Sequence, residues 1–169
     1  MNYIFIDIDG VLNSGKFLLK YIDEDIAIDD RPVKLLSELV HKYSAKIILS
    51  SSWRRHYTEN GELRDGDYPK ERDLYLIQTL YKYNIAISGR TRVGISKYGD
   101  PYDEGNRAEE IQEFINKNLV EEDNYVIFDD EDFTGTLLTF GKHFIQTNWE
   151  KGLTKRNIKK AKKVFKHTV

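Results

Sequence analysis

Short apolar runs alternate with helix-like segments along this chain, and this alternation limits the possible folds more than any other feature. The runs cover residues 3–6, 46–49, 85–87, 125–128 and 143–146. A short, continuous apolar run is typical of a strand that is buried on both faces. The first four runs therefore predict buried strands, and the last run is a candidate fifth strand.

Between and after these runs, apolar residues recur at the spacing of a helix that buries one face. The predicted helices cover residues 31–43, 69–83, 106–118 and 154–166. Asp30 is the expected cap of the first helix, and Thr154 is the expected cap of the last. In the second helix, the residues expected to face inward are Leu74, Ile77, Leu80 and Tyr81.

Strands that alternate with helices imply right-handed crossovers and a parallel sheet between layers of helices. The chain has 169 residues, a length typical of one domain. We therefore predict an α/β fold with a central parallel sheet, in a single domain that spans residues 1–169.

The composition excludes several kinds of protein. No stretch of the sequence approaches the ~20 consecutive apolar residues that a membrane helix needs. The N-terminus lacks the basic region of a secretory signal, so we expect a cytoplasmic protein without a membrane partner. The chain contains no cysteine, which excludes disulfides, thiolate zinc sites and cysteine nucleophiles.

The net charge of −2 is unevenly distributed. Residues 151–169 carry eight basic residues and no acid, whereas the rest of the chain carries 18 basic and 28 acidic residues. On the predicted last helix, Ile158, Ala161 and Phe165 form one apolar stripe, and the lysines fall mostly on the other sides. This basic face fits two interpretations: a solvated helix surface, or a contact with the phosphate backbone of a nucleic acid.

Polar side chains follow three of the predicted strands. Asp7 and Asp9 follow the first strand, Ser51 the second, and Asp129 and Asp130 the fourth. Because the carboxyl ends of parallel strands meet at one edge of a sheet, we expect these side chains to converge. Crowded carboxylates repel one another unless a cation intervenes, and Mg²⁺ prefers oxygen ligands beside a substrate phosphate. The four aspartates are therefore the expected Mg²⁺ ligands.

The same residues suggest catalytic roles. Asp7 is a candidate nucleophile, and Asp9, which faces the same side of the strand, is a candidate general acid and base. The hydroxyl of Ser51 and the guanidinium of Arg107 are expected to bind phosphoryl oxygens. Gly10 would let the chain turn sharply as it leaves the strand.

Four segments, in this order, resemble the four motifs of the haloacid dehalogenase-like (HAD) phosphatase superfamily. They are the strand and Asp-x-Asp-Gly sequence at 3–10, the strand and serines at 47–51, Arg107 at the start of a helix, and the strand and Asp-Asp pair at 126–130. The resemblance implies a Rossmann-like core, Mg²⁺, and hydrolysis of phosphomonoesters through an aspartyl-phosphate. It implies that Asp130 takes the metal and that Asp129 supports it. The phosphate-binding hydroxyl is Ser50 or Ser51, and alignment on the following Trp-Arg favours Ser51.

Further segments resemble one subfamily, the HAD domain associated with "Swiss Army Knife" RNA-repair-type proteins. They are Ser51–Arg54, the segment that begins at Asn106, Tyr125–Asp130 and residues 144–154. The subfamily implies a link to nucleic acids. Val11 stands where many members of the superfamily have threonine. No long insertion separates the motifs, so we expect a minimal cap or none, with small flaps at 12–30 and at 54–68 or 90–105.

We therefore predict a Mg²⁺-dependent phosphomonoester hydrolase whose substrate is a phosphorylated nucleic-acid end or a nucleotide. Two alternatives remain open: a phosphatase of small molecules such as sugar phosphates, and a non-catalytic module that binds nucleic acid or another partner. Trp53 and Arg54 also have two interpretations. They either pack a flap, or stack on a base and grip a phosphate.

Overall fold

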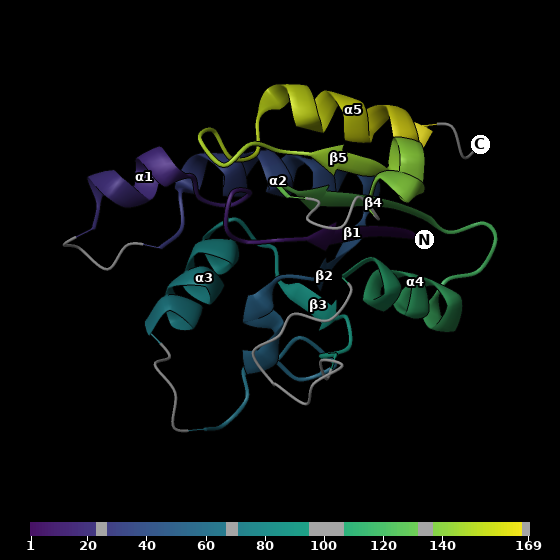
Figure 1. Ribbon diagram of the computed structural model, residues 1–169, viewed down its shortest axis with the longest axis horizontal. Helices are drawn as coiled ribbons and strands as arrows, with labels where there is room; N and C mark the ends of the chain where they lie inside the picture. The colour runs from purple at the N-terminus through teal and green to yellow at the C-terminus, as the bar shows by residue number, and fades with distance from the viewer. Residues whose placement is uncertain (23–26, 67–70, 95–106, 132–136, 167–169) are drawn as a thin grey trace.

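A five-stranded, entirely parallel sheet forms the centre of the fold (Figure 1). The computed structural model describes residues 1–22, 27–66, 71–94, 107–131 and 137–166. The strands are β1 (Asn2–Ile6), β2 (Ala45–Leu49), β3 (Ile87–Arg90), β4 (Asn124–Asp129) and β5 (Phe144–Gln146). Their order is β3-β2-β1-β4-β5, with β1 in the middle. This arrangement confirms the predicted α/β, Rossmann-like fold, including the candidate fifth strand.

The three central strands end at the same level. Ile6 at the end of β1 pairs with Leu49 of β2 and with Phe128 of β4. The pairing continues beyond the strands, since the amide of Asp7 donates to the carbonyl of Phe128 (2.9 Å) and the amide of Ser50 donates to Ile6 (3.0 Å). The polar residues that follow these strands are therefore brought side by side, as the sequence predicts.

Helices cover both faces of the sheet (Figure 1). The helices are α1 (Gly15–Lys20), α2 (Asp30–Tyr43), α3 (Glu71–Lys82), α4 (Arg107–Asn118) and α5 (Lys155–Lys166), with the 3₁₀ segments η1 (Ser52–His56) and η2 (Leu137–His143). Buried side chains of α2, α3 and α5 pack with Ile4 and Ile6 on one face, and those of α4 and η2 pack with Tyr3 and Phe5 on the other. Alternate residues of β1 thus belong to two separate cores, which explains its continuous apolar run.

The α3 helix is rotated relative to the prediction. Leu74 and Tyr81 are exposed, whereas Leu76 and Leu80 are buried. Asp73 shares the buried side and pairs with His56 across 2.8 Å between its Oδ2 and Nδ1 of the imidazole. A search for apolar spacing cannot detect a helix face that buries a charged residue, and this explains the error.

Two element boundaries also differ from the prediction. The third strand begins at Ile87 rather than Ile85, because the Ile85 amide donates to the carbonyl of Leu80 (3.2 Å) and so belongs to the turn that follows α3. The cap of α2 is Asp29 rather than Asp30: its Oδ1 accepts from the Arg31 amide at 2.9 Å. Thr154 precedes α5 as expected, and the predicted apolar stripe of that helix is buried.

The loop between β5 and α5 packs on the loop that follows β1. The Thr147 hydroxyl donates to the carbonyl of Gly10, and the Leu153 amide donates to that of Val11, both at 2.8 Å. Gly152 has a φ of +63°, and a Cβ there would lie 2.6 Å from the carbonyl oxygen of Asn13. Residues 147–153 therefore help to shape the loop that carries Asp7 and Asp9. Among the residues that the structure describes, no helix has the length and apolar character to cross a membrane.

Candidate active site

The loop after β1 brings two aspartates and a glycine to the edge of the sheet. Asp7 is buried, and its Oδ1 accepts a hydrogen bond from the Ile8 amide at 2.8 Å. Gly10 has a φ of +71°, and a Cβ there would lie 2.2 Å from Cγ of Asp130. A glycine is therefore required both by the backbone conformation and by the close approach of Asp130.

Three carboxylates converge at this edge. Asp7, Asp129 and Asp130 each offer an oxygen, and these atoms lie within 4.8 Å of one another. Nη1 of Arg107, at the first residue of α4, is 3.2 Å from Oδ2 of Asp7 and also pairs with Asp129. Three of the four predicted metal ligands thus lie together, and the guanidinium of Arg107 lies beside them. The carboxylate oxygens of these three aspartates suit a hard metal ion such as Mg²⁺.

The cluster has an excess of negative charge. Burial, and then the charge of Asp7, raise the pKa of Asp129 to about 7, although Arg107 opposes the rise. The same two causes raise the pKa of Asp130 to about 6. Burial also raises the pKa of Asp7. A divalent cation would remove this conflict by favouring the charged form of each carboxylate, so the electrostatics agree with the choice of donors.

Asp9 lies outside this cluster and is held by other residues. Its Oδ2 accepts from Nε1 of Trp53 at 2.9 Å, and its Oδ1 accepts from Nδ2 of Asn13 at 2.8 Å. The Asn13 side chain is fixed in turn, because its Oδ1 accepts from the Gly10 amide at 2.9 Å. Both oxygens of Asp9 are thereby oriented, while the side chain remains partly exposed. Asp9 as a metal ligand stays a prediction.

Ser50 and Ser51, the first two of three serines after β2, are both buried. A side-chain hydrogen bond with Ser51 counteracts the rise in the pKa of Asp7, so the Ser51 hydroxyl lies at the candidate nucleophile. The Ser50 hydroxyl makes no hydrogen bond with the described part of the chain. Of these two serines, only Ser51 has its hydroxyl bonded to Asp7, and Ser51 as the phosphate-binding residue stays a prediction. Ser52 lines a cleft of about 200 Å³ together with Asp7, Asp9, Arg107, Asp130, Glu131 and Trp149.

Arg54 is buried inside the protein and pairs with an acid of α4. Its side chain is 1% exposed and forms a 2.6 Å ion pair with Glu110 of α4, which is also 1% exposed. Arg54 donates to the carbonyl of Ser51 at 2.8 Å, and the other oxygen of Glu110 accepts from the Gly94 amide at 2.9 Å. We call this pair the Arg54–Glu110 clamp. It fixes the turn at Ser50 and Ser51, here named the serine turn, against α4, the helix that begins with Arg107.

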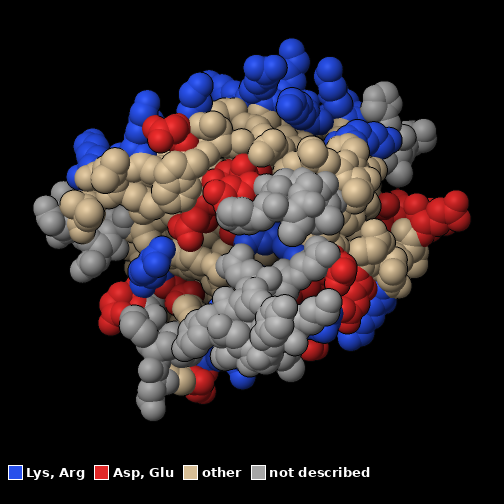
Figure 2. Space-filling model, viewed as in Figure 1, with Lys and Arg blue, Asp and Glu red and all other residues tan. Residues whose placement is uncertain are grey.

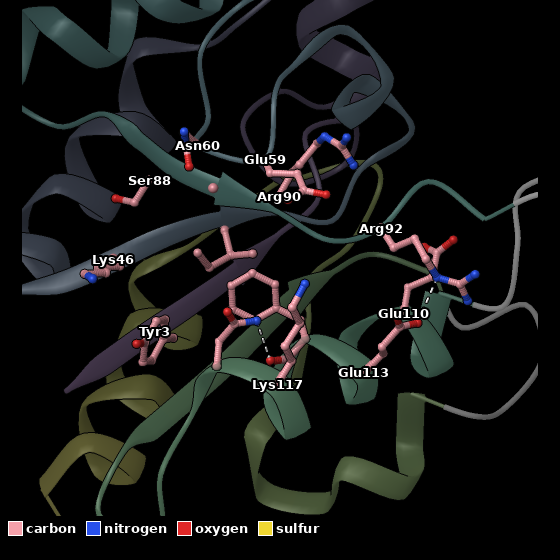
Figure 3. A pocket seen from close by; sticks show the side chains of 14 residues that line it. Tyr3, Lys46, Glu59, Asn60, Ser88, Arg90, Arg92, Glu110, Glu113 and Lys117 are labelled. Atoms are coloured by element: carbon pink, nitrogen blue, oxygen red, sulfur yellow. Dashed lines mark hydrogen bonds and ion pairs between the residues drawn. The ribbon is translucent and has the colours of Figure 1, made fainter.

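A second cavity, of about 470 Å³, lies on the α4 side of the sheet (Figure 3). Its walls carry charges of both signs, and Glu110 is one of its lining residues. Arg92 and Glu113, which also line it, form a 2.8 Å ion pair. The clustered aspartates do not line this cavity, so the candidate active site is the smaller cleft.

The sequence does not indicate that Trp53 and Asn13 orient Asp9. It allows Trp53 either to pack or to stack on a base, and in the structure the side chain is packed, with its Nε1 donating to Asp9. Asn13 carried one usable signal, a polar residue within the apolar stretch that follows Gly10. Asn106, at the predicted start of the third helix, lies outside the described residues.

Breaking the Arg54–Glu110 clamp should destabilise the protein strongly. Arg54→Met leaves the charge of Glu110 buried without its partner, and we expect the free energy of unfolding to fall by about 3–5 kcal/mol. The matched control is Arg92→Met, since the Arg92–Glu113 pair is 55% and 52% exposed and should contribute no more than about 1 kcal/mol. Urea denaturation measures both losses. Equal losses would contradict the structural role of the clamp.

The raised pKa values predict how the stability of the metal-free protein depends on pH. Between pH ~4 and pH about 7, the folded state keeps protons that the unfolded chain has already released. The free energy of unfolding should therefore fall as pH rises through this range. Asp129→Asn removes one such group, so the melting temperature of the variant should increase relative to wild type. Thermal melts in EDTA test this, and a pH-independent difference would refute it.

Comparison with known proteins agrees with this geometry. Residues 3–158 match the family model described as the HAD domain in Swiss Army Knife RNA repair proteins. No curated protein and no solved structure matches the chain. The matched region includes all the aspartates of the site, Ser51 and Arg107. The chain therefore belongs to the HAD domains of the Swiss Army Knife RNA repair type, with the phosphatase-like role that this family implies.

Proposed function

We propose that the protein is a Mg²⁺-dependent phosphomonoester hydrolase that forms an aspartyl-phosphate on Asp7. The observation that carries the proposal is the convergence of Asp7 with Asp129, Asp130 and Arg107. The oriented carboxylate of Asp9 stands two residues from the nucleophile. The proposed nucleophile Asp7 and the proposed acid Asp9 thus follow β1, and the phosphate-binding Arg107 stands at the start of α4.

Asp7, Asp129 and Asp130 are the residues that would hold the metal. Their donors are all carboxylate oxygens, and the pKa values of all three are raised by burial, which fits a site built to receive a cation. When bound, Mg²⁺ supplies neutralisation of the charge on the phosphoryl group.

The chain's own residues account for both steps of the reaction. In the first, an oxygen of Asp7 attacks phosphorus, the bond from phosphorus to the leaving oxygen breaks, and Asp9 gives that oxygen a proton. In the second, Asp9 takes a proton from a water that attacks phosphorus, and the acyl phosphate breaks to give inorganic phosphate and the free carboxylate of Asp7. Arg107 and Ser51 hold the phosphoryl oxygens through both steps.

Two observations support a nucleic-acid end or a nucleotide as the substrate. The matching family is described by its occurrence in RNA repair proteins. The outer face of α5 is also strongly basic, and Lys and Arg side chains crowd along this edge of the molecule (Figure 2). The exposed basic residues of the helix are Lys155, Arg156, Lys159, Lys160, Lys163 and Lys166. Such a face attracts a polyanion in a salt-dependent way.

Asp7→Asn tests the nucleophile. The amide keeps the shape of the side chain but lacks the attacking anion, so hydrolysis of an aryl phosphate with Mg²⁺ should fall by several orders of magnitude. Circular dichroism should show that the variant remains folded. Asp123→Asn is the matched control, because Asp123 pairs with the N-terminal amine at the opposite edge of the sheet, and it should retain activity. Wild-type turnover by a folded Asp7→Asn protein would exclude the mechanism.

Asp9 and Trp53 are tested by comparing leaving groups. Asp9→Asn should reduce kcat/KM for an alkyl phosphate by roughly 10²–10⁴-fold, and by less for an aryl phosphate, whose leaving oxygen needs less protonation. Trp53→Phe keeps the ring but removes the donor to Asp9, so its loss should be smaller and should show the same preference. Equal losses for the two substrates would assign Asp9 a structural role. No turnover by the wild type would favour a non-catalytic module instead.

A further inference from the structure

A pocket of about 440 Å³ lies beside the catalytic cleft, against α1 and the loop that precedes α5. Its walls are mainly apolar and include Leu19, Ile22 and Trp149. Leu19 is 73% exposed and Ile22 is 70% exposed. Apolar side chains of this size gathered at the surface are typical of a binding site.

Trp149 connects the pocket to the cleft, because it lines both. The residue is fixed against the start of α1: its carbonyl accepts from the Gly15 amide at 2.8 Å. A Cβ at Gly15 would lie 2.4 Å from the indole nitrogen, so the lack of a side chain there allows the indole to lie on the helix. The aromatic wall is therefore already in place before a ligand binds.

Arg72 marks the side of the cleft that the pocket joins. It lines the pocket, its Nη2 is 3.7 Å from Oδ1 of Asp9, and its guanidinium lies 4.4 Å from the centre of the Trp53 ring. In the reaction proposed above, Asp9 protonates the leaving oxygen. The leaving group must therefore lie on the Asp9 side of the phosphorus, and that side leads past Arg72 into the pocket.

The walls of the pocket combine apolar surface with charged groups of both signs. Tyr21 and Trp149 offer aromatic surface, while Arg72 offers donors and Glu150 offers acceptors. A nucleobase has the complementary pattern, since its faces stack on aromatic rings and its edge carries both carbonyl or ring acceptors and amino donors. An aliphatic leaving group would bury these charges without partners, and the leaving group of a sugar phosphate would leave the apolar walls uncovered.

We propose that this pocket binds the nucleobase of the leaving nucleoside, so that the substrate is a nucleoside monophosphate unit. The inference rests on the proposed function, because the assignment of the leaving-group side depends on Asp9 as the acid.

Kinetics with two substrates test the proposal. Adenosine monophosphate, as its 3′ and 5′ isomers, is compared with glycerol phosphate, which has no base. Trp149→Ala should lower the ratio of kcat/KM for the nucleotide to that for glycerol phosphate by roughly 5- to 150-fold, the range of base stacking on an aromatic side chain. Ile22→Ser should lower the ratio in the same direction. Val120→Ser is the matched control, since Val120 is similarly exposed but precedes β4 at the other edge of the sheet. Unchanged ratios in both pocket variants would overturn the proposal.

A binding measurement separates this inference from the proposed function. Calorimetry with adenosine alone needs no turnover, and Trp149→Ala and Ile22→Ser should both weaken its binding, whereas Val120→Ser should not. Hydrolysis of both substrates without adenosine binding would overturn the inference and leave the proposed function intact. Absence of turnover of both substrates would overturn the proposed function, and with it the leaving-group assignment. Phosphorylated oligonucleotides identify the source: a kcat/KM above that of the mononucleotide that falls with salt indicates a nucleic-acid end, and an equal value indicates the free nucleotide. Both results support the nucleobase pocket.

Discussion

Repulsion among three clustered carboxylates is the constraint that the rest of the structure must balance. Asp7, Asp129 and Asp130 are brought together because β1 and β4 are adjacent and end at the same level. The strands are held in this register by two hydrophobic cores, one on each face of the sheet. Burial of apolar surface thus stabilises an arrangement that electrostatics alone would oppose. A divalent cation that binds at this edge of the sheet would relieve the repulsion among the carboxylates, and a phosphate could bind beside it.

The arrangement works only if the groups around the carboxylates cannot relax away from them. The Arg54–Glu110 clamp joins the serine turn to α4, so that Ser51 and Arg107 approach the cluster from fixed directions. Trp53 and Asn13 play the corresponding part for Asp9. These supporting side chains join residues that are far apart in the sequence. Each of them makes hydrogen bonds with fixed partners, so the side chains of the site are held in place. Preorganisation of this kind favours a reaction in which charge moves over a short distance.

The sequence allowed the sheet and the edge of the site to be predicted because those features are local. Each apolar run marks its own strand, and the residue after the run lies at the end of that strand, so Asp7, Ser51 and Asp129 could be placed together without any knowledge of packing. The predictions that were wrong or left open concern residues whose role is set by distant partners. Asp73 faces inward because His56 is there, and Arg54 is buried because Glu110 lies on another helix. No periodicity within one segment contains that information.

The bonds between the loop after β1 and the loop before α5 make the shape of the acidic loop depend on the whole fold. Gly10, Val11 and Gly15 are each hydrogen-bonded to residues between 147 and 153. Joining segments so far apart in the sequence costs conformational entropy, which the sheet and helices between them must offset. The loop that carries Asp7 and Asp9 therefore takes its final shape together with the tertiary structure, and not as a local turn.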